Sequence, residues 1–466
     1  MATTAAVSKR AAQVPLKSKV SFAFAEFGSQ FVWTTVGSYL MVYYTNVALI
    51  APAAAGTIML VARILDGIQD LGFGYIAERT QSRWGRFRPW VIWGSPFLAL
   101  SLVVAFWSPN TGSVGKIWYA GITYVLLCFI YTVVNMAYGA MAGVMTTDTD
   151  ERLTLNWIRS IGSGLSQVLL GAITMPLILF FSGAGDGNTV NQTGYLWTMV
   201  VFGIVSVPMF LITGLNTKEV ITQTPEQSKV PFGQTVKAVL TNFPLMIVFT
   251  MLLINLIGLF GRIGMVAFYA MNNMGGPQFI AGVFTVFSMC SAAGQIILPR
   301  FASVIGKVPM LIISLGLSSV VLFAIYFADP TNTKMILILT GLYGFAGFAA
   351  PISLSMIPDS VDYYEWKHGI RADGTAYATV SLSTKIASAV GGAIGLYIIG
   401  FYGYDGAAQT QTAEVVHGIN VATNLVPAIL AAVAIIPLLF YRLDRKTMKM
   451  IEEELKARRN ADAPVD

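Results

Sequence analysis

Long apolar segments recur along the whole of this 466-residue chain, and they constrain its fold more than any other feature. The sequence is 55% hydrophobic and only 11% charged, whereas soluble domains carry about a quarter charged residues. Uninterrupted apolar runs of about 18 residues or more predict membrane-spanning helices rather than the weak alternation of a transmembrane barrel. We expect twelve such helices, over residues 21–48, 53–77, 89–107, 116–144, 157–181, 195–215, 242–271, 279–301, 308–327, 335–357, 375–401 and 415–441.

A polar, charged stretch between the sixth and seventh segments divides the chain into two halves of six helices. The connections 74–89 and 298–307 occupy equivalent places in the two halves, and each contains a glycine followed by a cation. This weak symmetry is typical of transporters that bind their cargo between two repeats. We therefore expect an all-α membrane protein with two pseudo-symmetric bundles. The expected parts are an N-terminal tail (1–20), a first bundle (21–215), a linker (216–241), a second bundle (242–441) and a C-terminal tail (442–466).

The positive charges favour one side of the membrane. Of the 29 Lys and Arg residues, only Lys116 and Lys334 lie near connections assigned to the outside, so both termini are expected in the cytoplasm. The protein is thus predicted to be a multi-pass protein of the cell membrane, in contact with lipid. The net charge of +6 follows from this bias, and no nucleic-acid partner is expected. The two cysteines, Cys128 and Cys290, are expected to be small buried hydrophobes.

Two carboxylates interrupt the second apolar segment. Asp66 and Asp70 are four residues apart and share one helix face, where they can close on a single cation. Gln69 is a neighbouring neutral oxygen donor. Burying a carboxylate in hydrocarbon costs at least a few kcal/mol, so we interpret the pair as a binding site for Na⁺, Li⁺ or a proton. The alternative is a structural ion pair with Arg63, but one buried arginine does not neutralise two carboxylates.

The fourth segment carries a polar and aromatic face. Tyr131, Asn135 and Tyr138 lie on one side of the predicted helix, with Thr132 beside them. Aromatic rings that stack on a sugar and amides that bind its hydroxyls are what a glycoside site requires. Hydrogen bonds between helices produce a similar pattern, so this interpretation has a structural alternative. Gln30 of the first segment is a further candidate for the same site.

Three cations lie within or at the edge of apolar segments, and each is a candidate substrate ligand or ion-pair partner. Arg159 begins the fifth segment, Arg262 lies in the middle of the seventh, and Lys385 lies inside the eleventh. Glu26 in the first segment is a candidate counter-charge for these cations.

Charged residues also gather where the chain is expected to face the cytoplasm. Arg79, Arg83 and Arg86 follow the second segment, and Asp359 and Asp362 follow the tenth. Contacts between these two sets would hold a transporter open to the outside, so we predict a gating role. Orientation of the chain and contact with anionic lipid explain the arginines equally well.

Three stretches carry a resemblance to a known family: VARILDGIQD at 61–70, SRWGRFRPW at 82–90 and PDSVDYYEWKHGIRADG at 358–374. Across nearly its whole length the chain resembles the glycoside–pentoside–hexuronide:cation symporters, a branch of the major facilitator superfamily that includes melibiose permease. The resemblance implies the major facilitator fold, with Asp66 and Asp70 as paired cation ligands and Thr132 beside them. It also implies that Arg159 borders the sugar site and that Lys385 lies near both pockets.

Three positions depart from melibiose permease. Gln30 and Asn135 stand where that carrier has acidic sugar ligands, and Gly139 stands where it has a stacking tryptophan. Such a site would accept a neutral xyloside or glucoside, and equally an anionic glucuronide or sulfonated hexose.

These observations predict a secondary active sugar transporter that couples a glycoside, pentoside or hexuronide to Na⁺, Li⁺ or H⁺ by alternating access. We expect a monomer without a cofactor. No nucleophile–base pair or metal constellation appears in the segments, so we do not expect an enzyme. The alternatives are a cation-dependent lysolipid transporter of the same fold and a sugar-binding membrane sensor.

Overall fold

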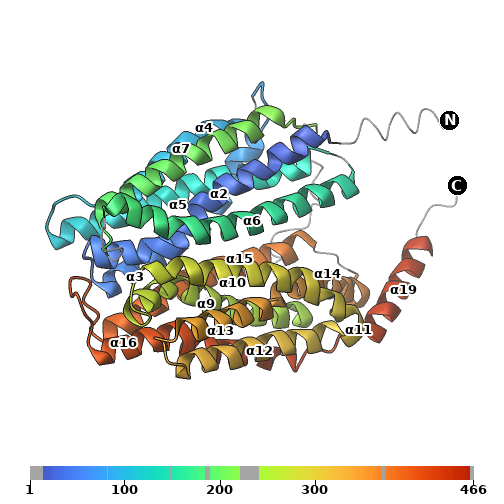
Figure 1. The fold of residues 1–466 in the computed structure, drawn as a ribbon. Helices are drawn as coiled ribbons and strands as arrows, with labels where there is room; N and C mark the ends of the chain where they lie inside the picture. Colours follow the sequence, from blue (N-terminus) through green and yellow to red (C-terminus); the bar gives the residue numbers. More distant parts are fainter. Residues whose placement is uncertain are drawn as a thin grey trace. The chain divides into compact units, whose positions relative to one another are not determined.

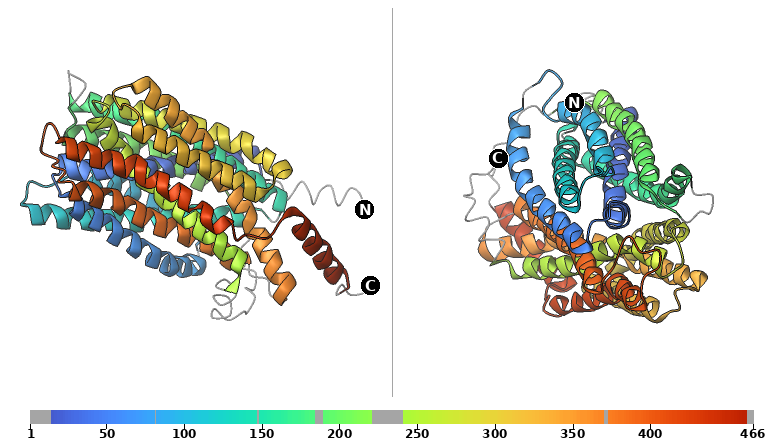
Figure 2. Two further views of the ribbon diagram at one scale, coloured as in Figure 1. Left: turned by 90° about the horizontal axis from the view of Figure 1, so that it is seen from below. Right: turned by 90° about the vertical axis from the view of Figure 1, so that its left-hand side faces the viewer.

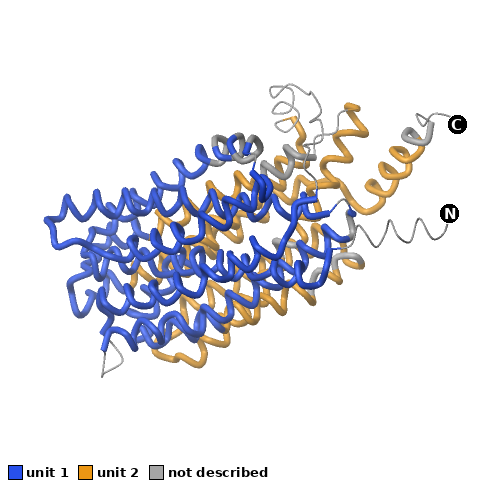
Figure 3. The backbone as a smooth tube through the Cα atoms, turned by 90° about the horizontal axis from the view of Figure 1, so that it is seen from above, with its two compact units in different colours: residues 1–227, 263–285, 396–416 blue, residues 228–262, 286–395, 417–466 orange. Residues whose placement is uncertain are grey.

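A computed structural model describes residues 14–80, 82–146, 148–183, 189–220, 241–369 and 373–461. The described chain is built of helices, as predicted, and nine of its helices are long and apolar enough to cross a membrane. It divides into two compact units, shown in different colours in Figure 3. The first unit contains residues 1–227, 263–285 and 396–416, and the second contains residues 228–262, 286–395 and 417–466.

Six long helices form most of the first unit (Figure 1). They are α2 (Leu16–Val42), α3 (Pro52–Arg79), α4 (Arg88–Ala105), α5 (Ser113–Val144), α6 (Thr149–Ser182) and α7 (Gln192–Asn216). The helix α2 continues into a π-helical turn, η1 (Tyr43–Val47), and packs against α6 and α7. The helix α5 packs against α3 and α4. These contacts place α5 next to α3, which carries the acidic residues.

The first unit also includes chain segments from the second half of the sequence. Two polar contacts fix residues 396–416 to the first helices: Tyr404 Oη donates to Asn46 Oδ1 at 2.9 Å, and the Tyr397 and Thr57 hydroxyls are 2.9 Å apart. The boundary between the two units therefore falls within several helices, so that one part of such a helix belongs to the first unit and the rest to the second. The division at the linker 216–241 that the sequence suggests remains a prediction, and residues 221–240 lie outside the described chain.

The second unit contains the remaining helices, apart from the portions within residues 263–285 and 396–416 of the first unit; Figure 2 shows the fold from two further directions. In chain order these helices are α9 (Phe243–Asn272), α10 (Gln278–Ile297), η2 (Leu298–Phe301), α11 (Ala302–Ile305), α12 (Lys307–Phe327), α13 (Thr333–Ala346), α14 (Ala349–His368), α15 (Asp373–Phe401), α16 (Ala413–Asn420), η3 (Val421–Leu425), α17 (Val426–Val433), α18 (Ile435–Leu438) and α19 (Arg445–Ala461). The portions that belong to the first unit are parts of α9, α10, α15 and α16.

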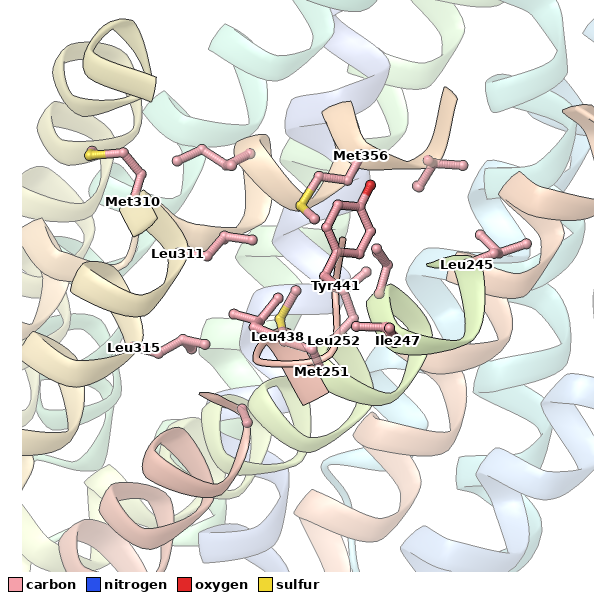
Figure 4. Packing of buried hydrophobic residues seen from close by; sticks show 14 of the residues in the cluster. Leu245, Ile247, Met251, Leu252, Met310, Leu311, Leu315, Met356, Leu438 and Tyr441 are labelled. Atoms are coloured by element: carbon pink, nitrogen blue, oxygen red, sulfur yellow. The ribbon is translucent and has the colours of Figure 1, made fainter. Parts of the chain in front are cut away.

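An apolar cluster joins α9, α12, α14 and α18 (Figure 4). Leu252 of α9, Leu311 of α12, Met356 of α14 and Leu438 of α18 are all nearly or fully buried within it. The ring of Tyr441 lies among these side chains, next to Met356 (Figure 4). Close packing of these side chains fixes the helices of this unit against one another.

Two of the predicted segments in the second half of the chain contain an irregularity next to a proline. The segment 335–357 is divided into α13 and α14 at Gly347, because Pro351 has no N–H to donate to the Gly347 carbonyl. The segment 415–441 contains the π-turn η3 followed by Pro427 at the start of α17. Pro427 likewise has no N–H to donate to the carbonyl of Thr423.

Residues 445–461 of the C-terminal tail form the helix α19. Its apolar residues Met448, Ile451 and Leu455 pack against the end of α14. A hydrogen bond from Trp366 Nε1 to Glu454 Oε2, 2.6 Å long, adds to this contact. The tail is therefore attached to the second unit by a small apolar core.

A single carboxylate organises the start of α4. The side chain of Glu219, which follows α7, accepts hydrogen bonds from the backbone N–H groups of Arg86, Phe87 and Arg88 at 2.8, 2.8 and 2.9 Å. These groups have no partner within the helix, and negative charge is favoured at a helix N-terminus. Gly85 has φ +109°, and a Cβ there would lie 2.5 Å from the Glu219 carboxyl carbon.

We expect Glu219→Ala to destabilise the protein by about 1 kcal/mol or more, because three N–H groups lose their acceptor. Glu219→Gln keeps one oxygen and should lose less. The thermal unfolding midpoint of the purified protein in detergent measures both. Equal midpoints for the two variants and the wild type would contradict this account of the helix start.

Candidate functional site

The carboxylate of Asp66 lies buried between α3 and α5, with 6% of the residue exposed. Thr132 Oγ1 of α5 donates to Asp66 Oδ1 at 2.5 Å. The other oxygen, Oδ2, lies 3.9 Å from Arg63 Nη1, which is an ion pair but too long for a hydrogen bond. The arginine therefore compensates the charge of the carboxylate without a direct hydrogen bond to it.

A second oxygen is available one turn along α3. The side-chain oxygen of Gln69 is buried and has no hydrogen-bond partner among the described residues. Because an unpaired buried oxygen is costly, this atom needs a ligand such as a cation or a water molecule. Asp70 follows in the same helix, but its side chain lies outside the described part of the chain. The side-chain oxygens of Asp66, Gln69 and Thr132 are hard ligands of the type that bind Na⁺, Li⁺ or a proton.

An aromatic stack connects Arg63 to the neighbouring polar cluster. The Arg63 guanidinium carbon lies 4.4 Å from the centre of the Trp33 ring, and Trp33 stacks on Tyr131 with 5.4 Å between ring centres. Sequence analysis did not identify Trp33. The available signal was its position on α2, three residues after Gln30 and therefore on the same helix face.

Tyr131 and Asn135 of α5 meet α2 at Ser29. The Ser29 hydroxyl lies 3.0 Å from Tyr131 Oη and donates to Asn135 Oδ1 at 3.2 Å. The Nδ2 group of Asn135 forms no hydrogen bond with any described residue, and the side chain is only half-buried. This amide is therefore able to donate to a ligand hydroxyl. Thr132 directly follows Tyr131 in α5. The contacts around Asp66 and those around Ser29 therefore involve neighbouring residues of the same helix.

Glu26, Gln30 and Arg159 form a third cluster, between α2 and α6. Arg159 Nε donates to Glu26 Oε2 at 2.8 Å, and Gln30 Nε2 donates to Glu26 Oε1 at 2.8 Å. Gln30 Nε2 also donates to Ser163 Oγ at 2.9 Å, while Gln30 Oε1 accepts from Thr34 Oγ1 at 2.9 Å. Both carboxylate oxygens of Glu26 thus accept hydrogen bonds. Of the three cations for which Glu26 is a candidate counter-charge, Arg159 is the one that pairs with it.

Tyr138 contributes mainly to helix packing. Its ring is fully buried, and its hydroxyl donates to the backbone carbonyl of Phe22 in α2 at 3.1 Å. The face of the ring lies 5.1 Å from the guanidinium carbon of Arg159. A Cβ on the neighbouring Gly139 would lie 3.6 Å from Arg159 Nη1. The glycine thus leaves the guanidinium accessible where a larger side chain would cover it.

The two candidate cations of the second half of the chain, Arg262 and Lys385, lie in the second unit. Arg262 of α9 is buried and donates to the Asn424 side chain and to the carbonyl of Thr423, at 3.2 Å for the latter. Thr423 lies in the π-turn η3, which ends just before Pro427. The Arg262 guanidinium carbon also lies 4.8 Å from the ring of Tyr343. Lys385 lies in α15 and is half-buried.

The predicted gating residues that the structure describes contact different partners. Asp359 of α14 accepts a hydrogen bond from Lys307 Nζ at 2.6 Å within the second unit. Arg83 is exposed beside Trp84, and the Arg86 N–H donates to Glu219. Asp362 also lies in α14, whereas the Arg79 side chain lies outside the described residues.

Comparison with known proteins places the chain in a family. A family model for MFS/sugar transport proteins matches residues 21–445. The chain therefore belongs to the sugar-transport family of the major facilitator superfamily, which makes it a multi-pass membrane transporter and not an enzyme. The resemblance to the glycoside–pentoside–hexuronide:cation symporters, which the sequence motifs predict, is confirmed.

Similar proteins include symporters and sugar carriers. The uncharacterized symporter YnaJ of Bacillus subtilis is 30% identical over 97% of each chain. The isoprimeverose transporter of Lactiplantibacillus pentosus is 28% identical over 96% of this chain and 93% of its own length. The glucuronide carrier protein homolog of Escherichia coli is 28% identical, covering 96% and 97%.

Solved structures confirm the predicted fold. A crystal structure of a D-xylose–proton symporter has a TM-score of 0.65 at 12% identity, covering 93% of this chain and 98% of its own. A point mutant of the nucleoside transporter NupG has a TM-score of 0.63 at 14% identity, covering 91% and 100%. Both similarities show the major facilitator fold of two six-helix bundles.

We expect Thr132→Ala to weaken cation binding about 10- to 150-fold, because a hydrogen bond to a charged acceptor contributes about 1.5–3 kcal/mol. Thr132→Ser keeps the hydroxyl and serves as the matched control. The measurement is the cation concentration that half-maximally raises the thermal unfolding midpoint, with Na⁺ and Li⁺ tested separately. If the alanine and serine variants respond at the same concentration, Thr132 does not support the cation site.

Proposed function

We propose that the protein is a cation-coupled symporter of a glycoside or pentoside, with the coupling cation held by Asp66, Asp70, Gln69 and Thr132. Family membership supports sugar transport, and several relatives are named as symporters. Alternating access moves the loaded carrier between its two states. The protein acts as a monomer in the cell membrane, with both termini in the cytoplasm.

The observation that carries this proposal is the position of two ligand-type clusters on one helix. The hydroxyl of Thr132 holds the buried carboxylate of Asp66, and the preceding residue, Tyr131, belongs to the polar cluster with Ser29 and Asn135. A cation that fixes this part of α5 would also fix the donors for a sugar. Such a linkage raises the affinity of each ligand in the presence of the other, typically by about 1–3 kcal/mol.

Each cluster has a role in the proposed cycle. Asn135 Nδ2 donates to a sugar hydroxyl, Tyr131 and Trp33 form an aromatic wall, and Arg159 borders the site. Gln30 holds Glu26 in place. Arg262 and Lys385 contribute from the second half of the chain. Contacts of Arg79, Arg83 and Arg86 with Asp359 and Asp362 stabilise the state that is open to the outside.

The direct test is uptake of radiolabelled glycosides into proteoliposomes with imposed Na⁺, Li⁺ or H⁺ gradients. The wild type should accumulate at least one glycoside when a gradient of the coupling ion is imposed, and not with gradients of the other ions. This result identifies both the sugar and the ion. Phospholipid that copurifies and that no sugar displaces would favour the lysolipid alternative.

We expect Asp66→Asn to reduce gradient-driven accumulation about tenfold or more, because a neutral amide no longer compensates a bound cation. Asp70→Asn should act in the same direction. Exchange of labelled for unlabelled glycoside without a gradient should be less affected. Undiminished accumulation in the Asp66 variant would show that this carboxylate is a structural partner only.

A further inference from the structure

Arg159 lies beside Tyr138 and Gly139 of α5, next to the proposed sugar site, and its charge is compensated within the protein. Its Nε donates to Glu26 Oε2 at 2.8 Å, and the side chains of Arg159 and Glu26 are 33% and 6% exposed. Nε is the only atom of Arg159 that hydrogen-bonds with the described residues. The two Nη groups therefore remain accessible to a ligand, beside Gly139.

The carboxylate of Glu26 is held rigidly in this position. Its second oxygen accepts from Gln30 Nε2, and the orientation of the Gln30 amide is fixed by Thr34 on the oxygen and by Ser163 on the nitrogen. A carboxylate with both oxygens engaged cannot turn away when a ligand approaches without losing its hydrogen bonds to the charged Arg159 and the neutral Gln30. The Arg159–Glu26 pair is therefore preorganised before substrate binds.

The pair determines which ligand charge the site tolerates. A substrate carboxylate that reached the Nη groups of Arg159 would lie close to the carboxylate of Glu26 in a partly desolvated environment. Repulsion between like charges is strong there, because the effective dielectric constant is far below that of water. Arg63 is similarly compensated by Asp66. Both arginines in the described part of the first unit's site thus have an acidic partner.

We propose that Glu26 is a specificity-determining residue that neutralises Arg159, so that the carrier accepts neutral glycosides or pentosides and rejects uronides. Hydroxyl groups of a neutral sugar use the Nη donors of Arg159 without bringing a second negative charge. This inference rests on the proposed sugar transport and specifies its substrate class. Removal of the Glu26 charge should expose the charge of Arg159 and shift the preference toward anionic sugars.

The test compares matched ligands that differ only at C6. We would measure dissociation constants for 4-nitrophenyl β-D-glucoside and β-D-glucuronide, and for the corresponding galactoside and galacturonide, with purified full-length protein and saturating coupling cation. The wild type should bind the neutral member of a pair at least about tenfold more tightly. Glu26→Gln should shift this ratio about tenfold or more toward the uronide.

Glu151→Gln is the matched control, since it removes the carboxylate of an ion pair to Lys19, 2.8 Å long, elsewhere in the same unit. It should leave the ratio within about threefold of the wild type. Arg159→Gln combined with Glu26→Gln should abolish the gained uronide binding, because the exposed charge is then absent.

Wild-type preference for the uronide, or an unchanged ratio in a folded Glu26→Gln variant, would overturn the inference. If Glu26→Gln does not yield folded protein, the wild-type ratio decides: preference for the neutral ligand supports the inference, and equal or reversed affinities overturn it. Uptake of uronides would leave the proposed sugar transport intact, whereas absence of gradient-driven uptake of every glycoside would refute the proposed function itself.

Discussion

Burial of the Asp66 carboxylate is the constraint on which the arrangement of the site depends. A carboxylate inside a membrane-spanning bundle must be compensated, because its transfer from water costs several kcal/mol. Thr132 Oγ1 donates a hydrogen bond to Asp66 Oδ1 at 2.5 Å, and the positively charged Arg63 Nη1 lies 3.9 Å from Asp66 Oδ2. Because Thr132 belongs to α5, this hydrogen bond requires α3 and α5 to pack together around Asp66. The arginine in turn requires the ring of Trp33, which brings α2 into the same cluster. One unfavourable burial thus sets the relative positions of three helices.

The same chain of contacts explains how two cargoes could be linked without a large internal rearrangement. Trp33 stacks on Tyr131, and Tyr131 lies next to Thr132 in the sequence. Displacement of α5 by a bound cation would therefore alter the position of Tyr131 and, through Ser29, of Asn135. In the proposed symporter, these packed side chains and hydrogen bonds would carry the linkage, and variants along them that change the coupling would show it.

Sequence periodicity predicted the helices well, because membrane-spanning segments must satisfy their backbone hydrogen bonds internally and be apolar over a fixed length. The spacing of Asp66 and Asp70 predicts a cation site, and this site stays a prediction; the structure describes the contacts of Asp66 with Thr132 and Arg63. Periodicity could not identify the partner of Arg159, since Glu26 lies more than a hundred residues away and only tertiary packing brings the two together. Trp33 was missed because an aromatic residue in an apolar segment is ordinary until a cation is found over its ring. Hydropathy likewise treats 415–441 as one regular segment, although it contains a π-turn whose Thr423 carbonyl accepts a hydrogen bond from Arg262 of another helix.

The central claim is that the cation at Asp66 and the sugar beside Tyr131 bind with a shared free energy. Isothermal titration of the wild type tests it most directly, by measuring glycoside affinity with and without the cation and cation affinity with and without the glycoside. The account predicts that both affinities rise by the same factor, of about 5 to 150. Glycoside affinity that does not depend on any of Na⁺, Li⁺ or H⁺ would contradict it.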